Sequence, residues 1–139
     1  MADTSGIPAQ RSRTWPLTLL RTTSLLFVFD TLVQAALAGL FITGDVGFLD
    51  LHAANAQLLA TTLALVEAMA ALLVWRSMRG PAWPFGVAVG LVVLVGAQMG
   101  LGAARMLGGH VPLALGVFGV GVALSCWACT YKGREGECG

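Results

Sequence analysis

The sequence predicts an all-α fold, a bundle of four transmembrane helices with up-down topology, from three observations. Of the 139 residues, 57% are hydrophobic and only 11% are charged, whereas a soluble domain carries about 25% charged residues. Four apolar runs are each long enough to cross about 30 Å of hydrocarbon. Most of the basic residues flank these runs, as they do at the cytoplasmic ends of membrane spans.

The four predicted spans cover residues 17–42, 51–75, 84–106 and 110–131. Between the second and third spans, Pro81 and Pro84 predict a short turn, because proline ends one helix and starts the next. The membrane domain is therefore expected at 15–132, with a disordered cytoplasmic tail at 1–14 and a second cytoplasmic tail at 133–139. These spans leave no space for a soluble catalytic domain, so any function is expected inside the bundle.

Charge predicts the orientation in the membrane and excludes one class of partner. Basic residues lie at the start of the chain, in the middle loop and after the last span: Arg11, Arg13, Arg21, Arg76, Arg79, Lys132 and Arg134. The first outer loop contains Asp45 and Asp50 and no basic residue, so the positive-inside rule places both termini of a multi-pass cell-membrane protein in the cytoplasm. The lipid bilayer is then the main partner, and a net charge of +1 argues against nucleic acid.

The first span also has a second interpretation. Its basic start and the sequence Ala36-Leu-Ala38 match a signal peptide with a cleavage site. The apolar run is long for such a peptide and contains Asp30 and Gln34, which favours a helix that is retained. Cleavage is the alternative, and it would leave three spans.

Polar residues inside the spans carry the functional signal, because ionisable and amide groups are costly in a bilayer and usually face the bundle interior. On a helical wheel the polar residues of each span share one face: Asp30 with Gln34, His52 with Asn55, and Gln98 with Arg105, while His110 begins the fourth span. Such stripes predict an internal polar site. The alternative is that they only join helices through hydrogen bonds, and we favour it for Gln34, Gln57 and Gln98.

The two histidines, the only ones in the chain, are the most specific of these residues. His52 and His110 each lie about 33–36 Å from the basic residue that ends their span, at 1.5 Å per residue. Two imidazoles at one depth on helices that run in the same direction predict the axial metal ligands of a b-type haem. The alternative is that both are interfacial polar residues near helix ends.

Other residues fit a haem at this position. Arg105 lies near the outer end of the third span and is suited to pair with a propionate, and Gln98 and Asn55 complete the predicted cofactor-binding set. Below His110 the fourth span presents small side chains that predict a shallow groove for a flat macrocycle: Ala114, Val117, Gly121 and Ala128. With two histidine ligands the iron has no open position, which favours electron transfer or haem handling over substrate binding.

Two segments resemble haem A synthase. Residues 95–114, Val-Gly-Ala-Gln-Met-Gly-Leu-Gly-Ala-Ala-Arg-Met-Leu-Gly-Gly-His-Val-Pro-Leu-Ala, are similar to the family's third helix, outer loop and histidine-bearing fourth helix. Residues 38–56, from Ala-Gly-Leu-Phe-Ile-Thr-Gly-Asp to Leu-His-Ala-Ala-Asn-Ala, look like the end of its first helix, the outer loop and the second helix. The resemblance covers about residues 34–125 and implies that His52 and His110 are the axial haem ligands.

The resemblance is to one four-helix half of a family that has eight spans. This implies either one haem site or a homodimer that restores two. Asp50 lies two residues before His52 rather than at the family's spacing, and the outer loop has no cysteine pair, so the resemblance implies haem binding more than synthase chemistry. If the protein is an enzyme, it is expected to be an oxidoreductase, with catalytic residues that the sequence does not identify.

Asp30 and Glu67 form a second constellation. Each lies about 13 Å from the inner boundary on consecutive helices, so the two carboxyls are expected to share a proton. A proton-coupled small membrane transporter is therefore a second hypothesis. A third is a non-catalytic subunit that packs in a larger membrane complex, for which 18 glycines offer close-packing surfaces.

The three cysteines add little to these hypotheses. Cys126-Trp-Ala-Cys129 ends the fourth span and Cys138 lies in the tail, all on the predicted reducing side of the membrane, where a structural disulfide is not expected. A single C-x-x-C without further ligands is a weak indication of a redox or metal role.

Overall fold

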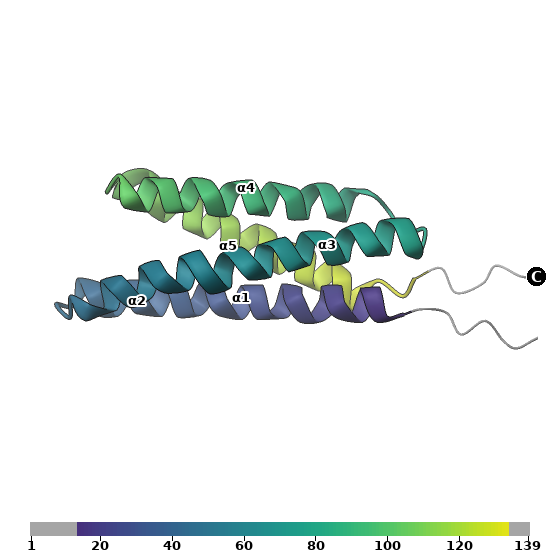
Figure 1. Cartoon of the computed structure of the whole chain (residues 1–139), viewed down its shortest axis with the longest axis horizontal. Helices are drawn as coiled ribbons and strands as arrows, with labels where there is room; N and C mark the ends of the chain where they lie inside the picture. The colour runs from purple at the N-terminus through teal and green to yellow at the C-terminus, as the bar shows by residue number, and fades with distance from the viewer. Residues whose placement is uncertain (1–13, 134–139) are drawn as a thin grey trace, which may run out of the picture.

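The computed structural model describes residues 14–133 and is a bundle of helices (Figure 1). In chain order the elements are α1 (Trp15–Ile42), α2 (Gly47–Asn55), the single π-helical turn η1 (Ala56–Ala60), α3 (Thr61–Ser77), α4 (Trp83–Ala103) and α5 (Leu107–Thr130). Because α2, η1 and α3 follow one another without a break, Gly47–Ser77 is one long helix. The all-α, four-helix prediction is confirmed, and the described residues contain no strand.

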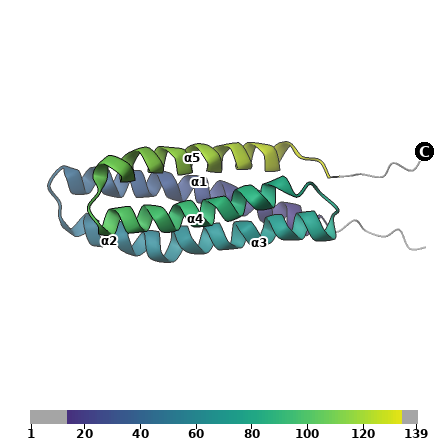
Figure 2. The same ribbon diagram turned by 90° about the horizontal axis from the view of Figure 1, so that it is seen from above.

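The four long helices run alternately up and down, so that α1 begins and α5 ends at the same end of the bundle (Figures 1 and 2). We call this the termini end, and the opposite end, with the α1–α2 and α4–α5 turns, the histidine end. Helix α1 packs against both α3 and α5, and α4 packs against the same two helices. The helix that contains α2 and α3 is therefore diagonal to α5, and residues on these two helices face each other across the bundle axis.

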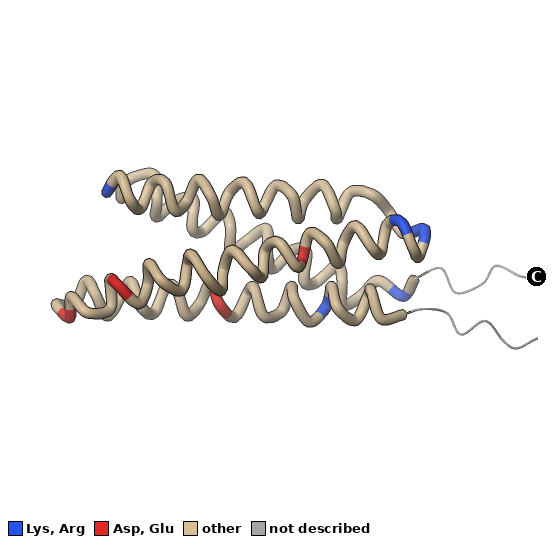
Figure 3. Tube along the Cα trace, viewed as in Figure 1, with Lys and Arg blue, Asp and Glu red and all other residues tan. Residues whose placement is uncertain are grey.

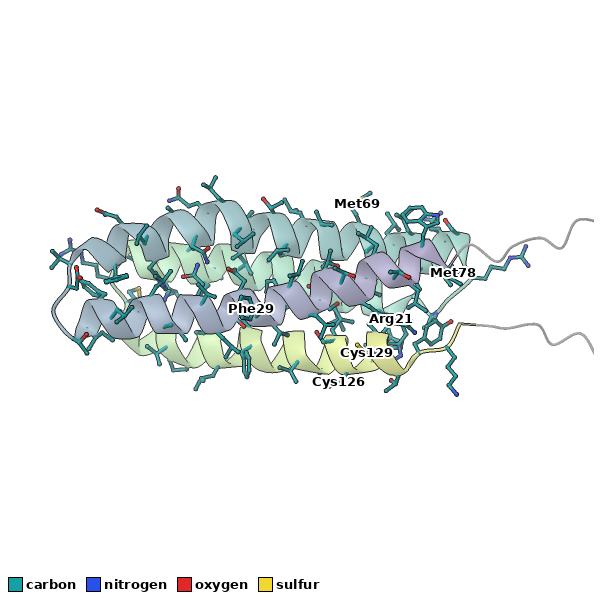
Figure 4. The ribbon with its side chains drawn as sticks, turned by 90° about the horizontal axis from the view of Figure 1, so that it is seen from below. Arg21, Phe29, Met69, Met78, Cys126 and Cys129 are labelled. Carbon is teal, nitrogen blue, oxygen red and sulfur yellow. The ribbon has the colours of Figure 1, made fainter. Side chains whose placement is uncertain are left out.

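All four helices are long and apolar enough to cross a membrane. Their outer faces carry large exposed apolar side chains, among them Phe29, Ile42, Val93 and Leu115, and Figure 4 shows Phe29 and Met69 on the outer faces of α1 and α3. A soluble protein rarely exposes so extensive an apolar surface. The surface is that of a multi-pass membrane protein, since lipid is as apolar as these side chains.

Prolines and turns of known chemistry set the helix ends. Pro16 and Pro84 lie in the first turns of α1 and α4, where a missing N–H leaves no hydrogen bond unmade. At the end of α4 the N–H groups of Arg105 and Met106 donate to Gly102 and Leu101, which is the Schellman pattern. Arg105 occupies its left-handed position with φ +58°, where glycine is usual.

Two of the predicted spans begin earlier than the sequence suggested. The second begins at Gly47 rather than at residue 51, because the Asp45 side chain accepts a hydrogen bond from the Gly47 N–H at 3.2 Å. Helix α5 begins at Leu107 rather than at residue 110. Both histidines therefore lie inside helices rather than at their starts. The predicted tails are residues 1–14 and 133–139. Apart from Thr14 and Gly133, they lie outside the described residues.

The packed interior is mostly apolar, and its buried polar side chains are Thr23, Ser24, Asp30, Glu67 and Ser125. Leu20, Phe27, Leu91 and Leu124 are fully buried between the helices. Charged residues are few, and Figure 3 shows most of the described Lys and Arg residues at the termini end. Arg21 is held there, because Nε donates to the Ala128 carbonyl at 2.9 Å and Nη2 donates to that of Tyr131 at 2.7 Å. It therefore caps the end of α5 beside Cys129 (Figure 4).

Candidate functional site

His52 on α2 and His110 on α5 face each other across the bundle axis near the histidine end. Their ring centroids are 6.2 Å apart and the ring planes are inclined by 61°. Both side chains are half-buried. The sequence predicted these two residues at one depth, because each lies a similar distance from the basic residue that ends its span. The structure brings them together from diagonal helices.

Gln98 and His110 are joined by two reciprocal hydrogen bonds. The Gln98 side-chain nitrogen donates to the His110 carbonyl at 2.8 Å, and Nδ1 of His110 lies 3.0 Å from the Gln98 carbonyl oxygen. A carbonyl oxygen can only accept, so Nδ1 is the donor and carries the proton of the neutral ring. Nε2 then keeps its lone pair, which is the state that a metal-ligating histidine requires.

The α1–α2 hairpin repeats this arrangement with Gln34 and His52. Nδ1 of His52 lies 3.1 Å from the Gln34 carbonyl oxygen. With the Gln34 amide nitrogen turned toward α2, it donates to the His52 carbonyl at 3.3 Å. That nitrogen also lies 2.7 Å from Nδ1 of His52 and can donate to it. If Nδ1 carries the proton, the Gln34 backbone carbonyl can accept from it, so Gln34 can bond to either tautomer of this ring. Each hairpin therefore contributes one glutamine and one histidine to the site.

Gly102 allows α4 to approach His110 closely. A methyl group at Gly102 would lie 3.2 Å from Cε1 and 3.4 Å from Nδ1 of His110, whereas one at Gly100 would meet nothing within 4 Å. The missing side chain at Gly102 therefore gives the His110 imidazole its space beside α4.

The histidine pair fits an axial ligand pair better than a bare metal site. Two imidazoles whose nitrogens each ligate one metal at about 2 Å have centroids about 6 Å apart, close to the observed 6.2 Å. Residues 14–133 contain no group of three or more metal-ligating side chains, and a protein zinc site needs at least three. A haem supplies its own four equatorial nitrogens and needs only the two axial ones. The buried Oε1 of Gln98 has no partner within the described chain, so the site retains an acceptor for one more donor.

Arg105 lies in the α4–α5 turn at the same end of the bundle. Its side chain is exposed and makes no hydrogen bond or ion pair with the described residues. Its left-handed backbone costs a non-glycine residue about 1 kcal/mol or more. Glycine would adopt this backbone conformation without that cost, so the turn itself gives no reason for an arginine at this position.

Asn55 makes no hydrogen bond with either described imidazole but connects the site to Asp30. Its side-chain nitrogen donates to Oδ1 of Asp30 at 2.7 Å and lies 3.2 Å from the Gln34 side-chain oxygen in the orientation given above. The π-turn η1 begins at the next residue, and Thr61 donates to the Ala56 carbonyl at 2.9 Å. Single π-turns are frequent at functional sites, and this one has no signal in the sequence.

Asp30 and Glu67 are both buried, but they do not form the expected pair. Ser24 donates to Oε1 of Glu67 at 2.5 Å, whereas Asp30 accepts from Asn55. Ser24 and Asp30 are six residues apart on α1, or about 9 Å along the helix axis. The expectation that Asp30 and Glu67 share a proton was wrong. Depth was estimated by counting residues from the basic anchors, and that estimate is not accurate to two helical turns. Oδ2 of Asp30 and Oε2 of Glu67 have no partner among the described residues.

The predicted groove below His110 was also wrong. Ala114 is exposed, and the ring of Phe27 occupies the space beside Gly121, where a methyl group would lie 3.1 Å from it. The small residues of α5 therefore accommodate α1. A cavity of about 240 Å³ lies elsewhere and is lined by Leu26, Phe29, Asp30, Val33, Leu59 and Leu63.

Cys126 and Cys129 are both exposed on α5 and form no disulfide. They lie at the termini end, far from the histidines (Figure 4). Cys138 lies outside the described residues. Cys126 and Cys129 therefore take no part in the candidate site.

Comparisons with known proteins do not add to this geometry. No protein-family model matches the chain, and searches of curated proteins and of solved structures return no match. The resemblance to haem A synthase stays a prediction that rests on the two segments quoted above.

Proposed function

We propose that this protein binds one b-type haem between His52 and His110 and serves in electron transfer or haem handling. The observation that carries the proposal is the pair of imidazoles facing each other from diagonal helices, 6.2 Å between centroids, with each Nδ1 on a backbone carbonyl. A carbonyl that accepts from Nδ1 orients a metal-ligating histidine and leaves Nε2 free for the metal. Gln98 gives His110 this state, and His52 has it in one of the two tautomers that Gln34 can bond to.

The surrounding residues have separate tasks in this proposal. The Gln34 and Gln98 carbonyls hold the two rings, and Gly102 gives His110 room beside α4. Arg105, free at the same end, is suited to a propionate, because a guanidinium binds a carboxylate through two hydrogen bonds. A bound haem would supply one-electron redox chemistry, and two histidine ligands leave no open position for a substrate.

The proposal includes a location in the cell membrane with both chain ends in the cytoplasm. Arg21, Arg76, Arg79 and Lys132 support it, because these described basic residues flank the spans at the termini end. Reporter fusions test this orientation. A reporter that is active only outside the cytoplasm should be silent at the C-terminus and active in the α4–α5 turn.

The decisive experiment is a reduced-minus-oxidised visible spectrum of detergent-purified protein expressed with haem available. We expect a sharp α-band in the wild type that is lost in His52→Ala and in His110→Ala. Gln57→Ala is the matched control, because Gln57 is exposed on η1 and its removal should leave the band unchanged. A colourless wild type, or a band that survives both histidine substitutions, overturns the proposal.

Proton-coupled transport is a second candidate function, favoured by the unpartnered buried oxygens of Asp30 and Glu67. Buried acids within spans commonly mark proton pathways. In liposomes that contain a pH-sensitive dye, an imposed potential should then drive proton uptake that Asp30→Asn and Glu67→Gln both abolish. Uptake no faster than in empty liposomes would exclude this function.

A further inference from the structure

Asp30 is the buried acid nearest to the histidine pair along the chain of hydrogen bonds. Its side chain is only 2% exposed. Oδ1 accepts the hydrogen bond from Asn55, and Oδ2 has no partner in the described part of the chain. Since Oδ1 is already an acceptor, Oδ2 is the oxygen on which a proton can be held.

A continuous polar connection leads from Asp30 to His52. Asn55 Nδ2 lies between Oδ1 of Asp30 and Oε1 of Gln34, at 2.7 and 3.2 Å. In this orientation the Gln34 amide nitrogen lies 3.3 Å from the His52 carbonyl and donates to Nδ1 of the ring at 2.7 Å. When Nδ1 carries the proton, the Gln34 backbone carbonyl 3.1 Å away can accept from it. Asp30 and Gln34 are four residues apart, about 6 Å along α1. A change of charge at either end therefore acts on the other through a short path in an interior of low dielectric constant.

The other titratable groups around α1 do not replace Asp30 in this role. On the packed helix of α2 and α3 they are Asp50, His52, Glu67 and Arg76, of which Asp50 and Arg76 are exposed and Glu67 binds Ser24. On α5 they are His110 at the histidine end and Cys126 and Cys129 at the termini end. Arg21, on α1 itself, is bound to the end of α5. No described cationic side chain pairs with Asp30.

We propose that Asp30 is a redox-linked proton site, which takes up one proton from water when the centre between His52 and His110 takes up one electron. This inference rests on the proposed function. The electron comes from a one-electron reductant outside the chain, and reoxidation returns both the electron and the proton. An added electron removes one positive charge from the centre, so it lessens the stabilisation of a nearby carboxylate, and the coupling is reciprocal.

The test is a redox titration of the purified haem-loaded protein at a series of pH values. Proton uptake favours reduction, so the midpoint potential should fall as pH rises, by up to about 59 mV per pH unit for one electron and one proton. Asp30→Asn keeps an acceptor for Asn55 and should give a potential that does not change with pH. Asp30→Glu keeps a carboxyl and should restore part of the slope.

Glu67→Gln is the matched control, because Glu67 is buried like Asp30 but bonded to Ser24 instead of Asn55. It should keep the wild-type slope. A redox-difference infrared spectrum gives a second readout, in which a carboxylic acid band should be present in the wild type and missing in Asp30→Asn.

Three outcomes overturn the inference: a flat wild-type potential, a slope that survives Asp30→Asn, or a slope that Glu67→Gln abolishes. In each of these the haem spectrum is present, so the proposed function stands. A wild type without haem overturns both, and among the outcomes of this titration it alone removes the proposed function.

Discussion

Gln98 and His110 exchange two hydrogen bonds across the α4–α5 turn, one of 2.8 Å from the glutamine side chain and one of 3.0 Å at Nδ1. Gln34 and His52 make the equivalent contacts across the α1–α2 turn. Each histidine is thus held by contacts within its own hairpin. The separation of the rings then depends on how closely the diagonal helices approach the bundle axis.

Gly102→Ala should displace His110. The added methyl group would lie 3.2 Å from Cε1, which is tighter than ordinary van der Waals contact, so the ring must move or α4 must shift. Overpacking of this kind costs about 1–3 kcal/mol. We expect haem affinity to fall about tenfold or more, since about 1.4 kcal/mol is a factor of ten. Titration of haem into haem-free protein measures the change.

The control for this substitution is Gly100→Ala on the same helix, where the new methyl group meets nothing within 4 Å. It should leave haem affinity unchanged. Equal effects of the two substitutions would mean that Gly102 acts through the general flexibility of α4 and not through His110.

Ser24→Ala should destabilise the bundle by leaving the Glu67 carboxyl without its described partner. Oε2 of Glu67 is already unpartnered, and Ser24 supplies the hydrogen bond to Oε1. Loss of one partner of a buried polar group costs about 1–3 kcal/mol. Denaturant titration in detergent micelles, followed by circular dichroism, measures the free energy of unfolding.

The double variant Ser24→Ala with Glu67→Leu tests whether the loss of stability comes from this hydrogen bond. Replacing both partners by apolar groups is close to neutral, so the double variant should recover most of the stability lost in Ser24→Ala. If the double variant is less stable than Ser24→Ala alone, the hydrogen bond is not the source of the effect.

The helices and the approach of the histidines could be predicted from the sequence for simple physical reasons. Apolar runs bounded by prolines such as Pro16 and Pro84 specify spans, because a helix in lipid must satisfy its own backbone. Equal rise per residue from the basic anchors placed His52 and His110 at one depth. Neither argument depends on how the helices rotate about their axes.

What could not be predicted depends on that rotation. Spacing placed Asp30 and Glu67 at one depth, but Asp30 binds Asn55 and Glu67 binds Ser24, because the helices also shift along their axes when they pack. The groove expected beside Gly121 is filled by Phe27, which is a consequence of how α1 and α5 interlock. The π-turn after Asn55 shifts the register of the second span by a fraction of a turn, and no composition or motif signals it.

Gly121→Ala should destabilise the contact between α1 and α5. A methyl group at this position would lie 3.1 and 3.2 Å from two carbons of the buried Phe27 ring, and a close-packed core gives way only at a cost of about 1–3 kcal/mol. Thermal unfolding in detergent should show a lower midpoint than the wild type. Gly119→Ala, with open space at its Cβ, should not lower it, and an equal loss in both variants would exclude the Phe27 contact as the cause.

Arg105→Gly should separate backbone strain from function. Arg105 has φ +58° at the end of α4, a conformation that glycine adopts without the penalty that a side chain incurs. We expect the free energy of unfolding to rise by about 0.5–1 kcal/mol, because relief of the left-handed strain is partly offset by the greater backbone freedom of glycine in the unfolded chain. We also expect haem to bind less tightly, because the guanidinium that would pair with a propionate is lost.

Arg79→Gly is the matched control, because Arg79 has φ +52° at the end of α3 but lies at the termini end. It should gain similar stability with no change in haem affinity. Measured side by side, the two variants distinguish a charge that serves the site from one that only follows the positive-inside pattern. If Arg105→Gly binds haem as tightly as Arg79→Gly does, Arg105 contributes no more to the site than any other basic residue in a loop.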